Sequence, residues 1–450
     1  MSESLLCYLH TFGCQMNVRD SEKAALLMEQ AGYSVTNDLE AADVIIVNTC
    51  SVRAKAEQKA HSFIGRVRRL KADKPGLVLG VTGCLAQQWG SRFFTRFHHV
   101  DFVCGTHAMD RIPAMATAVR GGCGRQEDTA FRDEPGALDI RAHHAAGALS
   151  AFVTVMQGCD NFCAYCIVPH VRGRERSRRP GDILKEVADL AAAGVKEVTL
   201  LGQNVNSYGK GLEESVTFPL LLARVADIDG IERVRFTTSH PKDLSDELVA
   251  ALADLKPLCE HIHLPLQSGS TEILRRMKRG YTAEEYGEKI SVLRDRIPSV
   301  SITTDIIVGF PGESDGDFEK TIDLMRKVRF DNAFSFKYSD RPGTAAERYD
   351  GAVGEDVKKQ RLATLQKLQA RHTLEKNRAL EGTVEEVLVE GPGKGSPLDM
   401  AGRTRSNRIV NFSGDGFLRG QTVPVKIVRG YAHSLRGEMI NKEAESQPCL

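Results

Sequence analysis

Short apolar runs alternate with amphipathic stretches along the first 120 residues of the chain. The runs at 5–9, 44–47 and 77–81 predict buried strands. Helical sequence follows each of them, over 18–30, 52–70 and 85–97, and 100–104 is a fourth predicted strand. Strands that alternate with helices in this way indicate a doubly wound α/β domain over residues 1–120.

The alternation stops and then resumes. Residues 121–148 are polar and rich in Gly and Ala, and they contain Pro135 and the pair His143 and His144, so we predict a linker with solvated histidines. From 149 to 378, amphipathic stretches such as 182–193 and 317–327 separate six apolar runs, at 152–156, 198–201, 234–236, 262–266, 302–308 and 333–336. Six successive βα units predict a partial (β/α)6 barrel whose active face carries the loops after the strands.

The last fifth of the chain has a different pattern. A long helix is predicted over 355–379, and short alternating runs separated by Gly-rich turns follow it. That pattern indicates a small antiparallel β-barrel over residues 379–440.

Composition narrows the class of protein. The chain has 450 residues, of which 42% are hydrophobic and 26% charged, with a formal net charge of +1. These values are those of an ordinary globular protein and exclude a disordered or fibrous one. The chain begins without a signal peptide pattern and has no apolar run long enough to cross a bilayer, which predicts a cytoplasmic protein with no membrane partner.

Cysteine is the unusual residue, with eleven copies in a chain without an export signal. Metal or redox chemistry is therefore favoured over a disulfide framework. Cys159, Cys163 and Cys166 form a C-x3-C-x2-C loop directly after the first strand of the predicted (β/α)6 barrel. The loop fits a zinc site with His170 as fourth ligand, or a four-iron cluster ligated at three corners with one open iron.

Three further cysteines share one context. Cys14, Cys50 and Cys84 each close an apolar run and precede helical sequence. The carboxyl ends of parallel strands lie along one edge of a sheet, so these thiols are expected to converge there, although each alone could be a small buried hydrophobe. We interpret the other five as small buried hydrophobes without a chemical role, namely Cys7, Cys104, Cys123, Cys259 and Cys449.

Local charge points to nucleic acid. Between 391 and 437 there are eight Lys or Arg residues against two acids, and between 53 and 74 there are again eight against two. A third basic run lies just after the three-cysteine loop, comprising Arg172, Arg174, Arg176, Arg178 and Arg179. Such patches attract a phosphate backbone, although the segment 53–74 could equally be a solvated helix face. Polar loops at 202–206, 237–241, 265–270 and 308–313 line the predicted active face.

The chain resembles the radical S-adenosylmethionine methylthiotransferases along its whole length. The resemblance rests on the C-x3-C-x2-C loop with an aromatic residue before its last cysteine, the three strand-end cysteines and a terminal barrel like a TRAM domain. The segments 11–17, 201–209 and 402–412 are similar to the tRNA-modifying branch of the family, and Gln15, Met16 and Asn17 favour that branch over the one acting on a ribosomal protein.

The resemblance implies two [4Fe–4S] clusters and two molecules of S-adenosyl-L-methionine per turnover. Cys159, Cys163 and Cys166 would hold the radical cluster, and Cys14, Cys50 and Cys84 an auxiliary cluster that carries sulfur. The implied substrate is N6-isopentenyladenosine at position 37 in a tRNA anticodon stem-loop, which would receive sulfur and methyl at C2. That C–H is not acidic enough for a side-chain base to remove its proton, so abstraction of the hydrogen by a radical is the plausible route. The implied partners are an electron donor such as flavodoxin or ferredoxin and a sulfur source.

By analogy with the family, loop residues would bind the cofactor and arginines the RNA. The expected S-adenosylmethionine contacts are Tyr165, Gly202, Gln203, Asn204, Ser239, Gln267, Asp305 and Ile307. The expected RNA contacts are Arg172, Arg174, Arg403, Arg405 and Arg408. Replacement of Arg403 and Arg405 by alanine is expected to weaken tRNA binding and flatten its salt dependence. Three alternatives stay open: a methylthiotransferase acting on threonylcarbamoyladenosine in tRNA, one acting on a ribosomal protein side chain, and a non-enzymatic iron–sulfur carrier or RNA scaffold.

Overall fold

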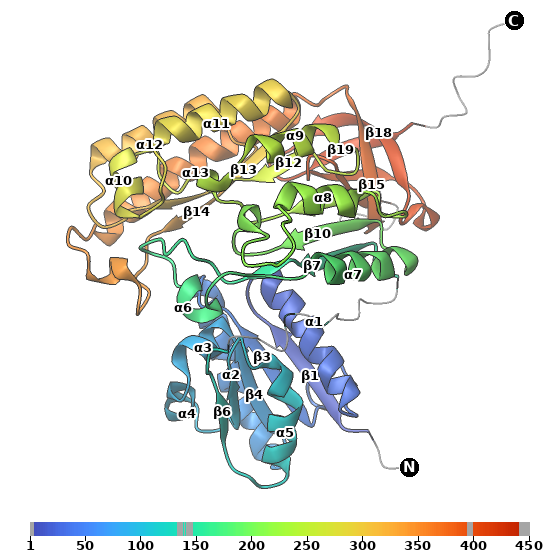
Figure 1. The fold of residues 1–450 in the computed structure, drawn as a ribbon, viewed down its shortest axis with the longest axis vertical. Coiled ribbons are helices and arrows are strands. Elements are labelled where there is room, and N and C mark those ends of the chain that lie inside the picture. The colour runs from blue at the N-terminus through green and yellow to red at the C-terminus, as the bar shows by residue number, and fades with distance from the viewer. Residues whose placement is uncertain (1–3, 133–137, 139, 141–146, 394–398, 441–450) are drawn as a thin grey trace, which may run out of the picture. The chain divides into compact units, whose positions relative to one another are not determined.

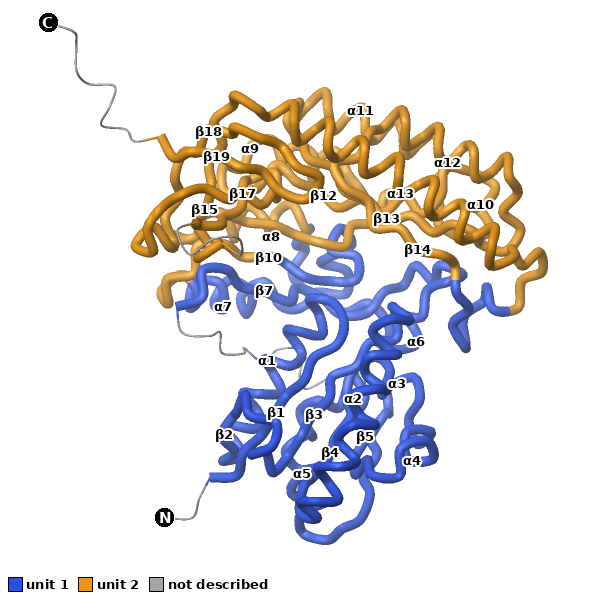
Figure 2. The backbone as a smooth tube through the Cα atoms, turned by 180° about the vertical axis from the view of Figure 1, so that it is seen from behind, with its two compact units in different colours: residues 1–190, 200–217, 339–347 blue, residues 191–199, 218–338, 348–450 orange. Residues whose placement is uncertain are grey.

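The structure is a computed structural model that describes residues 4–132, 138, 140, 147–393 and 399–440. The predicted histidine pair 143–144, Pro135 and Cys449 lie outside this part of the chain. The chain divides into two compact units, shown in Figure 2. The first contains residues 1–190, 200–217 and 339–347, and the second contains 191–199, 218–338 and 348–450.

The first unit contains a six-stranded, entirely parallel sheet in the order β2-β1-β3-β4-β5-β6 (Figure 1). Its strands are β1 (Leu6–Thr11), β2 (Ser34–Val35), β3 (Val44–Thr49), β4 (Val78–Gly83), β5 (Phe102–Cys104) and β6 (Gln126–Asp128). The four predicted strands are confirmed. The two additional edge strands are too short or too polar to have an apolar signature, and β6 lies inside the segment predicted as a linker, so that prediction was wrong there.

Helices cover both faces of this sheet, which confirms the doubly wound architecture. They are α1 (Gln15–Gln30), α2 (Ala54–Asp73), α3 (Cys84–Trp89), α4 (Arg92–Arg96) and α5 (Ile112–Arg120), with a 3-10 turn η1 (Met109–Arg111). Alternate residues of β3 enter opposite cores. Val44 and Ile46 pack with α1 and α5, whereas Ile45 and Val47 pack with α2, α3 and α4.

All six strands predicted for the middle of the chain are present. They form two three-stranded sheets, β11-β10-β7 and β12-β13-β14. The strands are β7 (Ser150–Thr154), β10 (Glu197–Leu201), β11 (Arg233–Phe236), β12 (His261–His263), β13 (Ser301–Val308) and β14 (Asn332–Lys337), and β8 (Met156–Gln157) pairs with β9 (Arg176–Ser177).

Helices and 3-10 turns connect these strands as expected for βα units. The helices are α6 (Val168–Arg172), α7 (Pro180–Ala192), α8 (Phe218–Ala226), α9 (Asp246–Asp254), α10 (Thr271–Arg276), α11 (Ala283–Arg296) and α12 (Asp315–Val328). The 3-10 turns are η2 (Val205–Ser207), η3 (Pro241–Asp243) and η4 (Ala345–Arg348). Among the described residues, no helix is both long and apolar enough to span a membrane.

The predicted long helix and small barrel are both confirmed in the second unit. Helix α13 (Glu355–Arg378) packs along β14 and leads into a closed barrel in the order β15-β16-β17-β19-β18. Its strands are β15 (Val384–Pro392), β16 (Asp399–Thr404), β17 (Ile409–Ser413), β18 (Thr422–Gly430) and β19 (Leu435–Met439), with η5 (Gly416–Leu418). The prediction of an entirely antiparallel barrel was wrong in one pairing, because β17 and β19 are parallel.

Candidate functional site

Three thiols stand at the carboxyl ends of three adjacent strands in the first unit. Cys14 follows β1, Cys50 follows β3 and Cys84 begins the helix after β4. Strands β1 and β3 are neighbours at the point where the chain reverses its direction across the sheet, which is where doubly wound folds bind ligands. The predicted convergence of these cysteines at one sheet edge is therefore what the topology provides.

Two glycines allow the cysteine loops to approach one another. A Cβ on Gly13, whose φ is +137°, would lie 2.9 Å from Cβ of Cys50 and 2.5 Å from Oδ1 of Asn17. Gly83, with φ +90°, would place a Cβ 2.4 Å from the Thr49 carbonyl oxygen. Any side chain at these positions would push the strand ends apart, so glycine is required immediately before Cys14 and Cys84.

Two asparagines that sequence reasoning did not select as site residues tie the loops together. The Asn17 amide donates to Oδ1 of Asn48 at 2.9 Å and to the Thr49 carbonyl at 3.1 Å, while the Asn48 amide donates to the Asn17 carbonyl at 2.8 Å. The Cys14 thiol lies 3.4 Å from Oδ1 of Asn17. Both asparagines are fully buried. Asn17 lies three residues after Cys14, and Asn48 lies two residues before Cys50, so proximity to the cysteines was the available signal.

The environment of the three thiols suits a cationic centre. Burial raises the pKa of Cys84 to about 12, partly offset by Arg172, and the neighbouring Cys50 and Cys14 raise it further. Burial, then the charge of Cys14, also raises the pKa of Cys50. Three cysteines after adjacent strand ends are a donor set of the type that ligates iron–sulfur clusters.

The C-x3-C-x2-C loop lies in the same unit. Cys159 and Cys163 are buried and Cys166 is half-buried. The side-chain oxygen of Gln203 accepts a hydrogen bond from the Gly158 N–H, and the Ala346 N–H donates to the Ala164 carbonyl at 2.8 Å. Phe162, between the first two cysteines, has φ +44°, an uncommon conformation for a non-glycine residue. The loop is therefore held from two sides, at Gly158 and at Ala164.

The predicted cofactor contacts in the first unit gather around β8 and β10. Tyr165 is half-buried in the cysteine loop, and Asn204 is 2% exposed. Gly202 follows β10 directly, and a Cβ there would lie 2.4 Å from Cγ of Met156 on β8. Gln203 is the residue bonded to Gly158 beside Cys159. These four positions thus lie on the loops next to the three-cysteine site.

The remaining predicted cofactor contacts belong to the second unit. The Gln267 N–H donates to the Asp305 carbonyl at 2.8 Å, and the Ile307 N–H donates to the Gln267 carbonyl at 3.0 Å, so these three residues are adjacent. Gln267 has φ +69°, and its Oε1 is buried without a hydrogen-bond partner in the described chain. The Ser239 hydroxyl, in the loop after β11, is likewise buried without a described partner. Unsatisfied buried oxygens at predicted contact positions fit a polar ligand.

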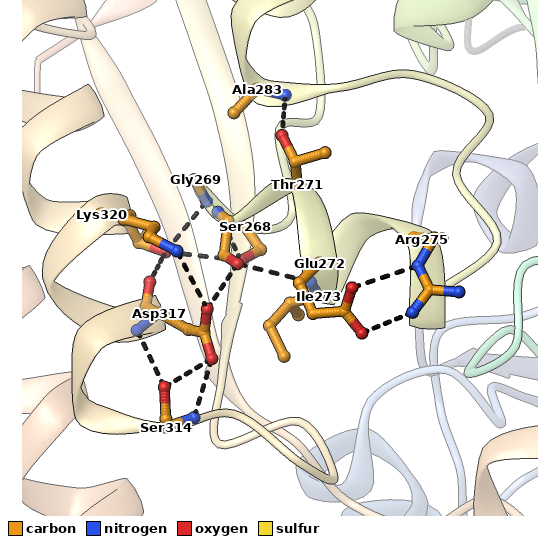
Figure 3. A network of polar contacts seen from close by, with 12 residues as sticks. Ser268, Gly269, Thr271, Glu272, Ile273, Arg275, Ala283, Ser314, Asp317 and Lys320 are labelled. Carbon is orange, nitrogen blue, oxygen red and sulfur yellow. Dashed lines mark hydrogen bonds and ion pairs between the residues drawn. The ribbon is translucent and has the colours of Figure 1, made fainter.

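Helix α12 anchors the loop that carries Gln267. The Gly269 N–H donates to the Thr321 hydroxyl at 2.9 Å, and the Ser270 hydroxyl donates to Asp317 at 2.7 Å. Figure 3 shows Asp317 also paired with Ser314 at the start of α12 and with Lys320 one turn later. This network holds the unusual backbone of Gln267 in place.

One face of the sheet β12-β13-β14 carries exposed aromatic residues from the apolar run 333–336, which predicted a strand. Phe334 and Phe336 on β14 are 49% and 37% exposed. They pair in register with Asp305 and Ile307 on β13, and the His263 ring lies 6.1 Å from that of Phe334. Exposed and half-buried residues alternate along β14, which marks a strand with one open face.

The predicted RNA-binding arginines occupy very different environments. Arg172 is 2% exposed, so the prediction that it contacts RNA was wrong, because a buried guanidinium cannot reach a phosphate. Arg174, two residues later, has 73% of its side chain exposed and lies 3.2 Å from Asp160. The charge of Arg174 is accessible to a polyanion.

The barrel arginines are neutralised by carboxylates. Arg403 pairs with Glu390 at 2.9 Å, Arg405 forms a two-pronged pair with Glu260, and Arg408 pairs with Asp331. In addition, Arg233 and Arg235 on β11 donate hydrogen bonds to the backbone carbonyls of residues 386 and 403–405 in the barrel. These contacts attach the barrel to the preceding domain inside the second unit and leave Arg405 and Arg408 little free charge for RNA.

Other basic residues on the barrel are exposed. Lys426 and Arg429 on β18 are exposed, and the Arg429 guanidinium lies 5.4 Å from the ring centre of Tyr431, which is 45% exposed. In the first unit, α2 presents a second exposed basic stripe, formed by Lys55, Lys59, Arg66 and Arg69. Basic side chains interleaved with an aromatic ring suit single-stranded nucleic acid.

The remaining cysteines mostly confirm their interpretation as hydrophobes. Cys7 and Cys104 are part of the core beneath α1 and α5, and Cys259 is 2% exposed. Cys123 differs, because it is exposed just after α5.

Comparison with known families defines the class of this protein. Residues 153–325 match the radical SAM superfamily, 6–105 match the uncharacterized protein family UPF0004, and 378–440 match the TRAM domain. The chain is thus a radical S-adenosylmethionine enzyme of three domains. This match supports an iron–sulfur cluster and S-adenosylmethionine as the cofactors of the class, rather than zinc.

Close relatives give the family within that class. The chain is 54% identical to the tRNA-2-methylthio-N(6)-dimethylallyladenosine synthase of Syntrophus aciditrophicus, over 97% of this chain and 95% of that protein. It is 53% identical to the enzyme of the same name from Syntrophobacter fumaroxidans, over 97% and 96% of the two chains. The chain belongs to the family of tRNA-2-methylthio-N(6)-dimethylallyladenosine synthases.

A solved structure supports the fold independently. The radical S-adenosylmethionine methyltransferase TsrM of Kitasatospora setae, solved with cobalamin and a [4Fe–4S] cluster, superimposes with a TM-score of 0.57 at 15% identity. The match covers 76% of this chain and 77% of that one. At this identity the similarity concerns the fold alone.

Proposed function

We propose that this protein converts N6-isopentenyladenosine at position 37 of tRNA to its 2-methylthio derivative by inserting sulfur and methyl at C2. The observation that carries the proposal is the sequence identity of 54% and 53% to relatives of that name over 97% of this chain. The chain also contains both sets of three cysteines. Cys14, Cys50 and Cys84 follow adjacent strands of the first unit, which also contains the C-x3-C-x2-C loop, so both centres would belong to one compact unit.

In this proposal Cys159, Cys163 and Cys166 hold a radical cluster, and Cys14, Cys50 and Cys84 hold an auxiliary one. When bound, these clusters and two molecules of S-adenosylmethionine per turnover supply the radical, the sulfur and the methyl group. The chain's residues position and shield them. Gln203 orients the start of the radical loop through Gly158, and Asn17 and Asn48 hold the auxiliary thiols.

We further propose that the eight predicted contact residues bind S-adenosylmethionine. In the first unit these are Tyr165, Gly202, Gln203 and Asn204, and in the second unit Ser239, Gln267, Asp305 and Ile307. The buried oxygens of Ser239 and Gln267 would accept hydrogen bonds from the charged or polar groups of the ligand. The open aromatic face of β14 offers Phe334 and Phe336 as stacking partners for an adenine.

The RNA substrate would be held chiefly by exposed basic residues. We propose Lys426, Arg429 and Tyr431 on the barrel, Arg174 beside the cysteine loop and the basic stripe of α2 as phosphate contacts. A target base stacked in an anticodon loop must be splayed out to reach a buried radical. An electron donor such as a flavodoxin or ferredoxin, a sulfur source and a cytoplasmic location complete the proposal.

Metal counting tests the two-cluster assignment. After anaerobic reconstitution the protein should contain about eight irons, and each triple cysteine-to-alanine variant should contain about four. Stoichiometric zinc, or loss of all iron in both variants, would contradict it. The reconstituted enzyme with S-adenosylmethionine and a reductant should methylthiolate tRNA that carries isopentenyladenosine. A ribosomal protein or threonylcarbamoyladenosine as the preferred substrate would refute the substrate assignment.

A further inference from the structure

Arg172 occupies an environment that neither RNA binding nor a solvated helix end explains. It is the last residue of α6, six positions after Cys166, and only 2% of its surface is exposed. Its Nε donates to Sγ of Cys84 at 3.2 Å. A guanidinium from the segment that follows one cysteine set therefore contacts a sulfur of the other set.

Asp20 holds this guanidinium in place from the opposite side. Nη2 of Arg172 lies 2.6 Å from Oδ2 of Asp20, whose side chain is 6% exposed. Asp20 is on α1, six residues after Cys14. The ion pair fixes the direction in which Nε points, since a buried guanidinium with one carboxylate partner has few alternative orientations.

The backbone around Arg172 is anchored as well. The His107 ring contacts the Arg172 carbonyl through Nε2 at 3.0 Å, and the Thr106 hydroxyl donates to the Val171 carbonyl at 2.6 Å. Val171 and Ile167 pack against Cys84 in a small apolar cluster. Helix α6 is thus attached to the end of the first sheet at several points, which keeps Nε at the Cys84 sulfur.

The terminal nitrogens of the guanidinium lack hydrogen-bond partners. Nη1 and Nη2 of Arg172 are both buried without one among the residues that the structure describes, although Nη2 has the ion-pair contact with Asp20. A buried cationic N–H without a protein acceptor costs free energy unless an anion satisfies it. A thiolate-ligated iron–sulfur cluster is an anionic acceptor of this kind.

We propose that Arg172 is a positioning residue for the auxiliary cluster, whose reduction potential it raises through its charge and its hydrogen bond to the Cys84 sulfur. The inference rests on the proposed function, because it requires a cluster at Cys14, Cys50 and Cys84. Hydrogen bonds to cluster sulfurs and nearby positive charge stabilise the reduced form, which carries one more negative charge. Arg172 therefore makes the auxiliary cluster easier to reduce.

The test uses the full chain with the radical cysteines replaced, C159A/C163A/C166A, so that one cluster remains. Into this parent we would introduce R172Q, R172K and, as a matched control, R174Q, which removes an exposed arginine two positions away. The measurements are iron content, the midpoint potential from a redox titration followed by electron paramagnetic resonance, and affinity for the tRNA anticodon stem-loop at fixed salt.

In R172Q we expect the reduction equilibrium constant to fall at least tenfold, a shift of about 59 mV for one electron. The shift should be smaller in R172K, which keeps the charge without the Nε bond, and absent in R174Q. RNA affinity should not change in R172Q. If R172Q binds no iron, the midpoint potential of the cluster in R172K decides whether the proposal holds.

A potential in R172Q or R172K equal to that of the parent would overturn the proposal. So would a tenfold loss of RNA affinity in R172Q at an unchanged potential, which would make Arg172 an RNA contact. Absence of iron from the parent itself would instead refute the auxiliary site of the proposed function, an outcome separate from the role of Arg172.

Discussion

Asn17 shows how a single side chain can join two loops of a site. It follows Cys14 by three residues, yet its amide bonds to Asn48 and Thr49, which directly precede Cys50. In the sequence it marked the tRNA-modifying branch of the family. In the structure its side chain sets the separation of two thiols that are 36 positions apart.

We predict that Asn17→Ala lowers iron at the auxiliary site. The substitution leaves buried polar groups of Asn48 and Thr49 without partners, at a cost of about 1–3 kcal/mol. Iron content after reconstitution should fall from about eight toward about four per chain if two four-iron clusters are bound. Gln30→Ala, at the exposed end of the same helix, is the control and should retain full iron. Full occupancy in Asn17→Ala would show that the asparagine is dispensable.

At the scale of elements, the terminal barrel separates its basic residues by role. Arg403, Arg405 and Arg408, at the end of β16 and in the turn that follows it, are paired with Glu390, Glu260 and Asp331. On β18, Lys426 and Arg429 point outward next to Tyr431. One side of the barrel therefore attaches to the preceding domain within the second unit, and another is left for a polyanion.

We predict that Lys426→Ala and Arg429→Ala each weaken tRNA binding and each reduce the slope of log affinity against log salt by about 1, as loss of one phosphate contact does. Filter binding or fluorescence anisotropy across a salt series measures this. Arg405→Ala serves as the comparison. It should lower the free energy of unfolding by about 1–3 kcal/mol, because Glu260 and two carbonyls lose their partner, and should change the salt slope less. A larger slope change for Arg405→Ala than for Lys426→Ala would reverse these roles.

At the scale of the whole molecule, buried charges and rings connect segments distant in sequence. Arg19 on α1 pairs with Glu186 on α7, and Glu186 also pairs with Arg178 at 2.7 Å. The first compact unit thus joins residues 1–120 to the beginning of the predicted radical domain. In the second unit, burial and then the charge of Arg235 lower the pKa of His261 to about 3.

This shifted pKa predicts a loss of stability in mild acid. In the unfolded chain His261 has a pKa of about 6.5, so between pH 6.5 and 3 only the unfolded state binds the proton. Between pH 7 and 5.5 the free energy of unfolding should fall by about 1 kcal/mol because of this histidine. Urea unfolding of the wild type and His261→Gln at both pH values measures the difference. An equal pH dependence in the two proteins would exclude this origin.

Much of the fold was predictable because strands and helices each have a characteristic local periodicity of apolar residues. The four main strands of the first sheet, the six strands of the middle segment, α13 and the barrel were all expected. The short edge strands β2 and β6 were missed because two or three half-exposed residues form no apolar run. The predicted boundaries at 120 and 148 differ from the compact units, because strand pairing and ion pairs bind segments regardless of their order.

The order of residues alone led to the prediction of six cysteine ligands, because spacing and strand ends are local properties, and the fold places Cys14, Cys50 and Cys84 after adjacent strands. Tertiary structure decided which polar groups surround those cysteines. Arg172, counted as one of five arginines in a basic run, became a buried partner of Cys84 and Asp20. Phe334 became an exposed ring. Whether a charge is solvated, paired or buried depends on residues far away in the sequence, such as Cys84, 88 positions from Arg172, and only the folded chain brings those residues into contact.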